Sequence, residues 1–235
     1  MQRLDKIISN QTSYSRSEIK QLVNKKKIKV NDKIVLKSDI KVDTNLDIIK
    51  INDEILEIKK YVYFILNKPK GYVSASKDNK DKTVLDLVPA KYKHRNLFPA
   101  GRLDKDTTGL MLITDNGVFA HDILSPKKHV KKTYEVIIDI PISDDMISGF
   151  KSGVMLNDGI CKTALLKKID VYKAIVTLTE GRYHQIKRMF GCYKAKVIEL
   201  KRISIGSFLL PEDLKSGEIK ELNEVEVNKI KEIIK

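Results

Sequence analysis

Apolar and polar positions along the chain separate a short first part from a longer second part. Within residues 1–59, apolar side chains at helical spacing predict helices near residues 4–8 and 19–23. The second helix follows Ser15-Arg16-Ser17-Glu18, a capping box in which serine accepts from a helix amide and glutamate reaches back. Alternating apolar positions around the polar pair Asn31-Asp32 predict a hairpin over residues 28–35, and a further strand is expected over 46–51.

The second part begins near Lys59-Lys60 and contains more strand-like than helix-like segments. Strands are predicted over residues 61–66, 110–114, 133–138, 163–169, 172–178 and 197–205. Short helices are predicted over residues 84–88, 118–124, 144–151, 184–190 and 225–234. Because the two types do not alternate strictly, we expect an α+β fold with a mixed, mostly antiparallel sheet flanked by short helices. The predicted domains are a small α/β unit, 1–59, and a larger one, 60–235.

The charge of the chain indicates an acidic partner. Its 235 residues include 45 Lys and Arg against 31 Asp and Glu, a net charge of +14. Residues 60–210 hold 27 of the basic and 15 of the acidic side chains, whereas residues 211–235 hold 5 and 7. Nucleic acid is the commonest partner of such a charge distribution.

Several classes of protein do not fit the sequence. The apolar runs are too short to span a bilayer, and the first residues lack the apolar region of a secretory signal. Cys161 and Cys192 lie far apart, as in a protein of the reducing cytoplasm, and the four histidines do not cluster into a zinc ligand set. No phosphate-binding glycine motif is present. We therefore expect a cytoplasmic protein without membrane contact, metal or cofactor.

The first candidate site is a polar loop bracketed by glycines that leads into an apolar strand. It reads Gly101-Arg102-Leu103-Asp104-Lys105-Asp106-Thr107-Thr108-Gly109-Leu110. Loops held by rigid strands often carry reactive side chains, but a solvated turn capped by aspartates has the same pattern. The spacing Asp104 to Thr108 also matches an aspartyl phosphotransferase motif, which needs a preceding strand that Pro99 disfavours.

The second candidate site is a basic amphipathic segment, residues 180–190. As a helix from about His184, it places His184, Lys187 and Arg188 on one face. The other face carries Ile186, Met189 and Phe190 as core anchors. The basic face can contact phosphate or hold a cation against a carboxylate, and an ordinary solvated helix face has the same composition.

The third candidate is the basic run of residues 127–132, which ends beside Tyr134 at the start of a strand. Backbone contact followed by base stacking is typical of a nucleic-acid surface. A solvated charge run beside an edge tyrosine is the plainer interpretation.

Taken together, these segments resemble a known family, the RsuA branch of the RsuA/RluB/RluE/RluF pseudouridine synthases. The similarity is carried by Gly101–Leu112, Lys132–Val136 and Glu180–Phe190, with Asn67-Lys68-Pro69-Lys70-Gly71 matching the family's first motif. Residues 1–59 resemble an S4 RNA-binding domain. They depart from it at Asp32-Lys33, where the pattern usually has glycine after Val-Asn; the turn should still form, because Asn and Asp tolerate the left-handed region.

The resemblance implies an enzyme that isomerises uridine to pseudouridine in ribosomal RNA, without a cofactor. It implies that Asp104 is the essential carboxylate, that Lys187 is its cationic partner and that Tyr134 stacks on the uracil. Leu200 is expected to pack on the base and Arg102 to hold the flipped nucleotide. The further RNA-binding residues that it suggests are Arg182, His184, Gln185, Arg188, Arg3, Arg16 and Lys20.

Small-subunit ribosomal RNA is the expected substrate, because Asp106-Thr107-Thr108 and Tyr183-His184 are similar to the small-subunit type. A large-subunit synthase of the same family and a non-catalytic RNA-binding assembly factor are the alternatives. The target uridine stays open, as does the choice between covalent addition of Asp104 and a glycal route. We expect a monomer.

Overall fold

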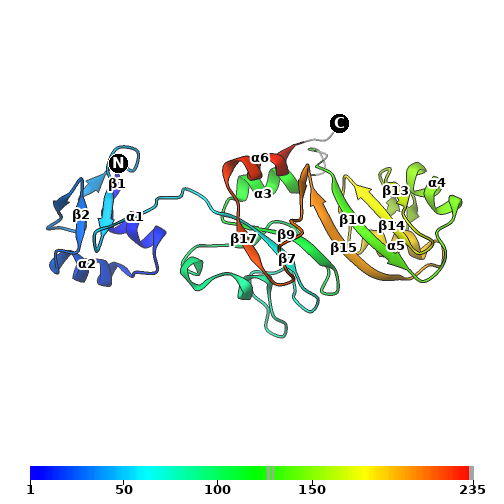
Figure 1. The fold of residues 1–235 in the computed structure, drawn as a ribbon, viewed down its shortest axis with the longest axis horizontal. Helices are drawn as coiled ribbons and strands as arrows, with labels where there is room; N and C mark the ends of the chain where they lie inside the picture. The colour runs from blue at the N-terminus through cyan, green and yellow to red at the C-terminus, as the bar shows by residue number, and fades with distance from the viewer. Residues whose placement is uncertain (126–127, 129, 233–235) are drawn as a thin grey trace. The chain divides into compact units, whose positions relative to one another are not determined.

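The computed structural model describes residues 1–125, 128 and 130–232, and these fall into two compact units. One unit comprises Met1–Tyr61 and Val88–Leu97, and the other comprises Val62–Leu87 and Phe98–Lys235. Figure 1 shows the chain coloured from blue at its N-terminus to red at its C-terminus. The expected division into 1–59 and 60–235 stays a prediction. Within the described ranges, no helix is both long and apolar enough to span a membrane.

The first unit packs two helices, α1 (Leu4–Gln11) and α2 (Arg16–Asn24), with short antiparallel strands. Four strands form a sheet in the order β3-β2-β5-β6, and β1 pairs with β4. Their bounds are Gln2–Arg3 (β1), Ile28–Val30 (β2), Lys33–Ile34 (β3), Lys41–Val42 (β4), Ile49–Ile51 (β5) and Glu54–Ile55 (β6). A 3-10 helix, η2 (Ala90–Tyr92), also belongs to this unit.

The local motifs predicted for this unit are present. The Ser15 hydroxyl accepts from the Glu18 amide, and the Glu18 carboxylate accepts from the Ser15 amide, so the capping box starts α2. Asn31 and Asp32 have φ of 49° and 63°, so the turn between β2 and β3 forms without glycine. The strand expected over 46–51 begins only at Ile49, because the backbone just before it forms a turn in which the Leu46 and Asp47 amides donate to the Asp43 carbonyl.

The second unit is built on a mixed sheet in the order β13-β14-β10-β15-β9-β7-β17, with β16 on β15 and β8 on β9. All described pairs are antiparallel except β9 with β15, so the predicted α+β class and mostly antiparallel sheet are confirmed. The strands are Tyr63–Lys68 (β7), Phe98–Pro99 (β8), Thr108–Thr114 (β9), Lys132–Ile138 (β10), Leu165–Lys168 (β13), Lys173–Leu178 (β14), Val197–Ile205 (β15), Phe208–Leu209 (β16) and Ile219–Glu221 (β17). A separate hairpin pairs Met155–Leu156 (β11) with Gly159–Ile160 (β12).

Some predicted elements differ from the observed ones in type or length. Residues 84–88 form a 3-10 helix, η1 (Val84–Leu87), rather than an α-helix. Pro99 is part of the two-residue strand β8. A proline is tolerated there because β8 pairs with β9 alone among the described strands, so its other edge needs no backbone donor. The strand expected over 163–169 shortens to β13. The helix expected over 225–234 is α6 (Glu224–Lys231), and the end predicted for it lies outside the described residues.

Helices cover the sheet at two places. Figure 1 shows α3 (Gly117–Leu124) and α6 together near β7 and β17, and α4 (Asp144–Ser152) and α5 (Gln185–Gly191) near β13 and β14. Phe119, Val227 and Ile230 of the first pair are buried in one cluster with Leu112 of β9. In the second pair, the ring centroids of Phe150 in α4 and Phe190 in α5 lie 4.8 Å apart.

The parallel contact between β9 and β15 depends on one glycine. Gly109 pairs with Arg202 and has a φ of 94°, a region that side chains rarely adopt. A Cβ atom at this position would lie 2.2 Å from the Arg202 carbonyl oxygen. The absence of a side chain therefore lets the two strands meet just where the polar loop, residues 101–107, enters β9.

Candidate active site

Asp104 lies in the polar loop and has a basic side chain on each carboxylate oxygen. Its Oδ1 atom is 3.3 Å from His184 Nε2, and its Oδ2 atom is 3.3 Å from Lys187 Nζ. Both basic residues come from the start of α5, about eighty residues later in the sequence. The side chains of Asp104 and Lys187 are only about one quarter exposed, at 25% and 24%. The fold thus gathers a partly shielded carboxylate and two basic groups.

Lys187 is shared between two aspartates. Its Nζ atom donates to both carboxylate oxygens of Asp106, at 2.6 and 2.8 Å, which is closer than its approach to Asp104. Partial burial raises the pKa of Asp106, but the ion pair with Lys187 outweighs it and holds that pKa below its usual value. Burial likewise lowers the pKa of Lys187, and the two carboxylates more than reverse this effect. Lys187 is therefore held as a cation.

Lys68, at the end of β7, supports this loop from below. Its side chain is fully buried, and its ammonium donates to the carbonyl oxygens of Pro69, Asp104, Lys105 and Thr107 at 2.9 to 3.3 Å. Burial lowers the pKa of Lys68 to about 8. The ammonium therefore ties the loop backbone at Asp104 and just after it to the end of β7.

A cleft of about 990 Å³ opens above Asp104. Tyr134 of β10 and Leu200 of β15 line it from neighbouring strands, and both are nearly buried. Arg102 also lines the cleft, and its exposed guanidinium makes no hydrogen bond or ion pair with any residue that the structure describes. The cleft thus brings an aromatic face, an apolar face and the Arg102 cation together with the Asp104 carboxylate.

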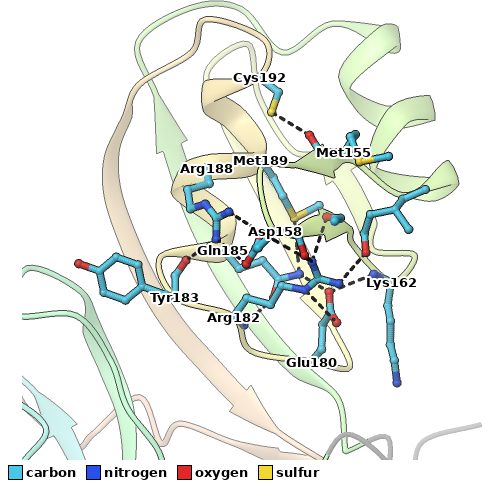
Figure 2. A network of polar contacts seen from close by, with 12 residues as sticks. Met155, Asp158, Lys162, Glu180, Arg182, Tyr183, Gln185, Arg188, Met189 and Cys192 are labelled. Carbon is cyan, nitrogen blue, oxygen red and sulfur yellow. Dashed lines mark hydrogen bonds and ion pairs between the residues drawn. The ribbon is translucent and has the colours of Figure 1, made fainter.

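The other basic and polar residues predicted in and just before α5 are bound within the protein (Figure 2). Arg188 forms a two-point ion pair with Asp158, and Arg182 donates to the carbonyls of Gly159 and Ile160. The buried Gln185 side chain donates to Glu180 and accepts from the Arg182 amide. Contacts of Arg182, Gln185 and Arg188 with RNA stay predictions.

The sequence interpretation missed several buried polar groups around the cleft. Lys132, treated as part of a basic run, is buried in β10 and donates to the carbonyls of Ile123 and Val130. Arg202 of β15 is buried and donates to the Leu110 carbonyl. Lys132 lies in the family's KTYEV motif, which was the one available signal, whereas nothing in the sequence marked Arg202. Lys127 and His129 of the same basic run lie outside the described residues.

The basic residues predicted on the first unit are exposed. Arg16 and Lys20 both lie in α2. Arg3 precedes α1 and forms an ion pair with Asp5 at 2.7 Å. Their contact with RNA stays a prediction.

Comparison with known proteins assigns the second unit. The model of the family described as RNA pseudouridylate synthase matches residues 62–191, more than half of the chain. The chain belongs to the RNA pseudouridylate synthase family. It therefore belongs to a family of RNA isomerases, and an S4 domain model matches residues 2–48.

Relatives of this synthase are similar over almost their whole length. The chain is 38% identical to the ribosomal small subunit pseudouridine synthase A of Escherichia coli (strain K12), over 96% of this chain and 98% of that protein. It is also 38% identical to an uncharacterized RNA pseudouridine synthase of Bacillus subtilis (strain 168), over 98% of each. A solved structure titled as a pseudouridylate synthase aligns with a TM-score of 0.69 and 36% identity, covering 98% of this chain and all of the other. The predicted family and fold are confirmed.

Proposed function

We propose that this synthase isomerises a specific uridine to pseudouridine in small-subunit ribosomal RNA, with Asp104 as its essential carboxylate. The observation that carries the proposal is the position of Asp104 below the cleft, with His184 on one oxygen and Lys187 on the other. Of these two neighbours Lys187 is held as a cation, and a nearby cation favours the charged form of a carboxylate. An ionised carboxylate is what both the covalent and the glycal route require.

The isomerisation breaks the C1′–N1 bond, turns the uracil within the site and joins C1′ to C5. The C5 proton leaves and N1 gains a proton, so no redox partner is needed. Tyr134 is proposed to stack on the uracil and to assist removal of the C5 proton, with Leu200 packed on the base. A uridine within structured RNA must leave its stack to reach Asp104, and Arg102 is proposed to hold the backbone of the flipped nucleotide.

The small subunit is proposed on two grounds. The relatives in Escherichia coli and Salmonella typhimurium are named ribosomal small subunit pseudouridine synthase A. Asp106-Thr107-Thr108 and Tyr183-His184 are also similar to the small-subunit type. In this proposal residues 1–59 add RNA affinity and residues 60–235 carry the chemistry, in a cytoplasmic monomer. The alternative of a non-catalytic assembly factor is disfavoured because Asp104 and Tyr134 line one cleft and Lys187 contacts Asp104 at 3.3 Å.

The test is pseudouridine mapping of small-subunit and large-subunit rRNA transcripts after incubation with the protein, and of rRNA from cells with and without the gene. We expect a specific uridine of the small-subunit transcript to be modified. Asp104→Asn removes the reactive charge with little change in volume, so modification should disappear while RNA binding is kept.

Asp106→Asn is the matched control, because it removes the same charge from the same loop. It should lower activity far less than Asp104→Asn, because the amide oxygen that replaces the Asp106 carboxylate can still accept from Lys187. Modification by Asp104→Asn would overturn the catalytic assignment. Modification of the large-subunit transcript alone would overturn the choice of substrate.

A further inference from the structure

Tyr183 is a large aromatic side chain that the proposed chemistry does not use. It lines the cleft, yet 71% of the residue is exposed to solvent. Its ring stacks on the ring of His184, with centroids 3.8 Å apart and planes inclined by 21°. Burying such a ring in a core would be favourable, so its exposure at the rim of a cleft is a feature of interaction surfaces.

The backbone that carries the two rings is held in an uncommon conformation. His184 has φ 47° and ψ 35°, the left-handed region, which residues with a side chain rarely adopt. Hydrogen bonds on both sides hold it there. Arg188 donates to the Tyr183 carbonyl at 3.2 Å, and the Arg182 amide donates to the Gln185 side chain at 2.9 Å.

The hairpin of β11 and β12 stabilises this arrangement from outside. Asp158, between the two strands, binds Arg188 through both carboxylate oxygens, and Arg182 donates to carbonyls of the same hairpin. Figure 2 shows the Tyr183 ring pointing away from this network, with the charged side chains on the other side of its backbone. The ring is thus presented outward on a fixed support.

The two rings lead directly to the reacting carboxylate. His184 contacts Tyr183 through its ring and Asp104 through Nε2. A planar group laid on the open face of Tyr183 would extend this stack from the rim of the cleft toward Asp104. Every nucleic acid base has such a face, and stacking on an aromatic side chain tolerates any base.

We propose that Tyr183 is a stacking platform for an RNA base that neighbours the target uridine in the chain. This proposal rests on the proposed function, because Tyr134 then holds the target uracil inside the cleft. Tyr134 is only 9% exposed and lies deep, whereas Tyr183 lies at the rim, so the two rings serve different nucleotides. Arg102, uncommitted and in the same cleft, supplies a cation for the intervening phosphate.

The experiment measures single-turnover modification of the small-subunit rRNA transcript at increasing concentrations of the full-length protein. Tyr183→Ala should raise the concentration for half-maximal rate about 5- to 150-fold, the range expected for one lost base stack. Tyr183→Phe keeps the ring and should stay within about twofold of the wild type. Tyr172→Ala is the matched control, since Tyr172 is a comparably exposed tyrosine outside the cleft, at 48%.

A second measurement identifies the stacked base. Once the modified uridine is mapped, transcripts with an abasic site just before or just after it are compared. At one of the two positions the abasic site should weaken the wild type by the same factor as Tyr183→Ala. Tyr183→Ala should bind this abasic transcript no more weakly than the intact one, because the two changes remove the same contact.

Three outcomes would overturn the platform. They are equal half-maximal concentrations for Tyr183→Ala and wild type, a fall in maximal rate alone, and additive losses with both abasic transcripts. A fall in maximal rate alone would mean that Tyr183 only supports His184. Failure of the wild type to modify any transcript would instead refute the proposed function. The platform would then be judged by equilibrium binding of the same transcript, in which Tyr183→Ala must still bind more weakly than Tyr183→Phe.

Discussion

At the scale of single residues, Lys187 holds two carboxylates with unequal contacts. It lies 2.6 Å from Asp106, whose side chain is 68% exposed, and 3.3 Å from the more shielded Asp104. An exposed ion pair contributes little to stability. The pairing with Asp106 is therefore best understood as a way of fixing the ammonium where it can also serve Asp104.

Replacing Lys187 by Met should release both carboxylates. The pKa of Asp106, which Lys187 holds below its usual value, should rise, and an NMR titration of the side-chain carboxyl carbons would measure it. A lowered carboxyl pKa adds stability above the pKa of the unfolded chain, and this is lost as the pH falls through the folded value. Any stability advantage of the wild type should therefore shrink below about pH 4.

Activity should fall strongly in Lys187→Met at every pH, because Asp104 loses its cation. Lys187→Arg is the control and should keep much of the activity, since the site requires a positive charge. An Asp106 pKa unchanged by Lys187→Met would contradict the pairing seen in the structure.

The residue scale also shows what a sequence can and cannot reveal. Asp104 and Lys187 were paired in advance only because the motifs that contain them resemble a family. The second contact of Lys187, with Asp106, was not predicted, because it depends on the side-chain positions of two segments that are distant in sequence. Lys68 belongs to the family's first motif, but its burial was not predicted, since lysine is rarely fully buried and no sequence pattern indicates the exception.

At the scale of elements, the spacing of apolar side chains was enough to place most of the second unit. The strand at Lys132–Ile138 alternates buried and partly exposed residues, as its pattern predicted. Segments shorter than a helical turn or two were placed less well: residues 84–88 contain a 3-10 helix, where too few side chains exist to define a period. The neighbours in the sheet were beyond prediction, because pairing such as β9 with β15 depends on long-range packing.

That parallel pair should tolerate no side chain at Gly109. Gly109→Ala combines a positive φ with a Cβ placed 2.2 Å from the Arg202 carbonyl oxygen, so the strands must separate. Gly159→Ala is the matched control: its φ is 103°, but nothing lies within 4 Å of its added Cβ. We expect Gly109→Ala to unfold at a clearly lower temperature than Gly159→Ala, which should lose about 1–3 kcal/mol from strain alone. Equal melting temperatures of the two variants would show that the contact between β9 and β15 can adjust to a side chain at Gly109.

The link from β7 to the polar loop depends on one ammonium group. Lys68→Met should leave buried carbonyls without a donor, which costs about 1–3 kcal/mol each, and should lower the maximal rate more than RNA binding. In the wild type, the rate should also decline as the pH rises through about 8, where the pKa of Lys68 lies. Lys68→Met should lack this decline.

The stability of the whole protein should not follow that decline. Burial lowers the pKa of Lys68 below that of the unfolded chain, so the unfolded chain binds the extra proton between pH 8 and about 10. The contribution of Lys68 to stability therefore rises with pH across this interval. If activity falls above pH 8 while the melting temperature does not, the decline belongs to the polar loop that Lys68 holds. If activity and melting temperature fall together, this assignment is wrong.

At the scale of the whole molecule, positive charge is spread along the chain, while the synthase family model matches only residues 62–191. Residues 1–59 hold 13 basic and 9 acidic side chains, and residues 60–210 hold 27 and 15. Long-range attraction to phosphate acts through the sum of such charges, whatever the placement of the units. In the proposed function, we therefore expect the S4-like residues 1–59 to raise the affinity for RNA through their charge.

Removing two charges from α2 should separate affinity from chemistry. In the full-length protein, Arg16→Gln with Lys20→Gln should weaken binding to the small-subunit transcript and reduce the slope of log K against log salt concentration by about one to two units. The single-turnover rate at saturating protein should be unchanged, because neither residue lines the cleft. Lys215→Gln with Lys229→Gln removes the same charge from the acidic segment 211–235 and should leave the slope near that of the wild type. Equal slopes for the two double variants would mean that α2 makes no phosphate contact, and a lower rate at saturation would mean that it also positions the RNA in the cleft.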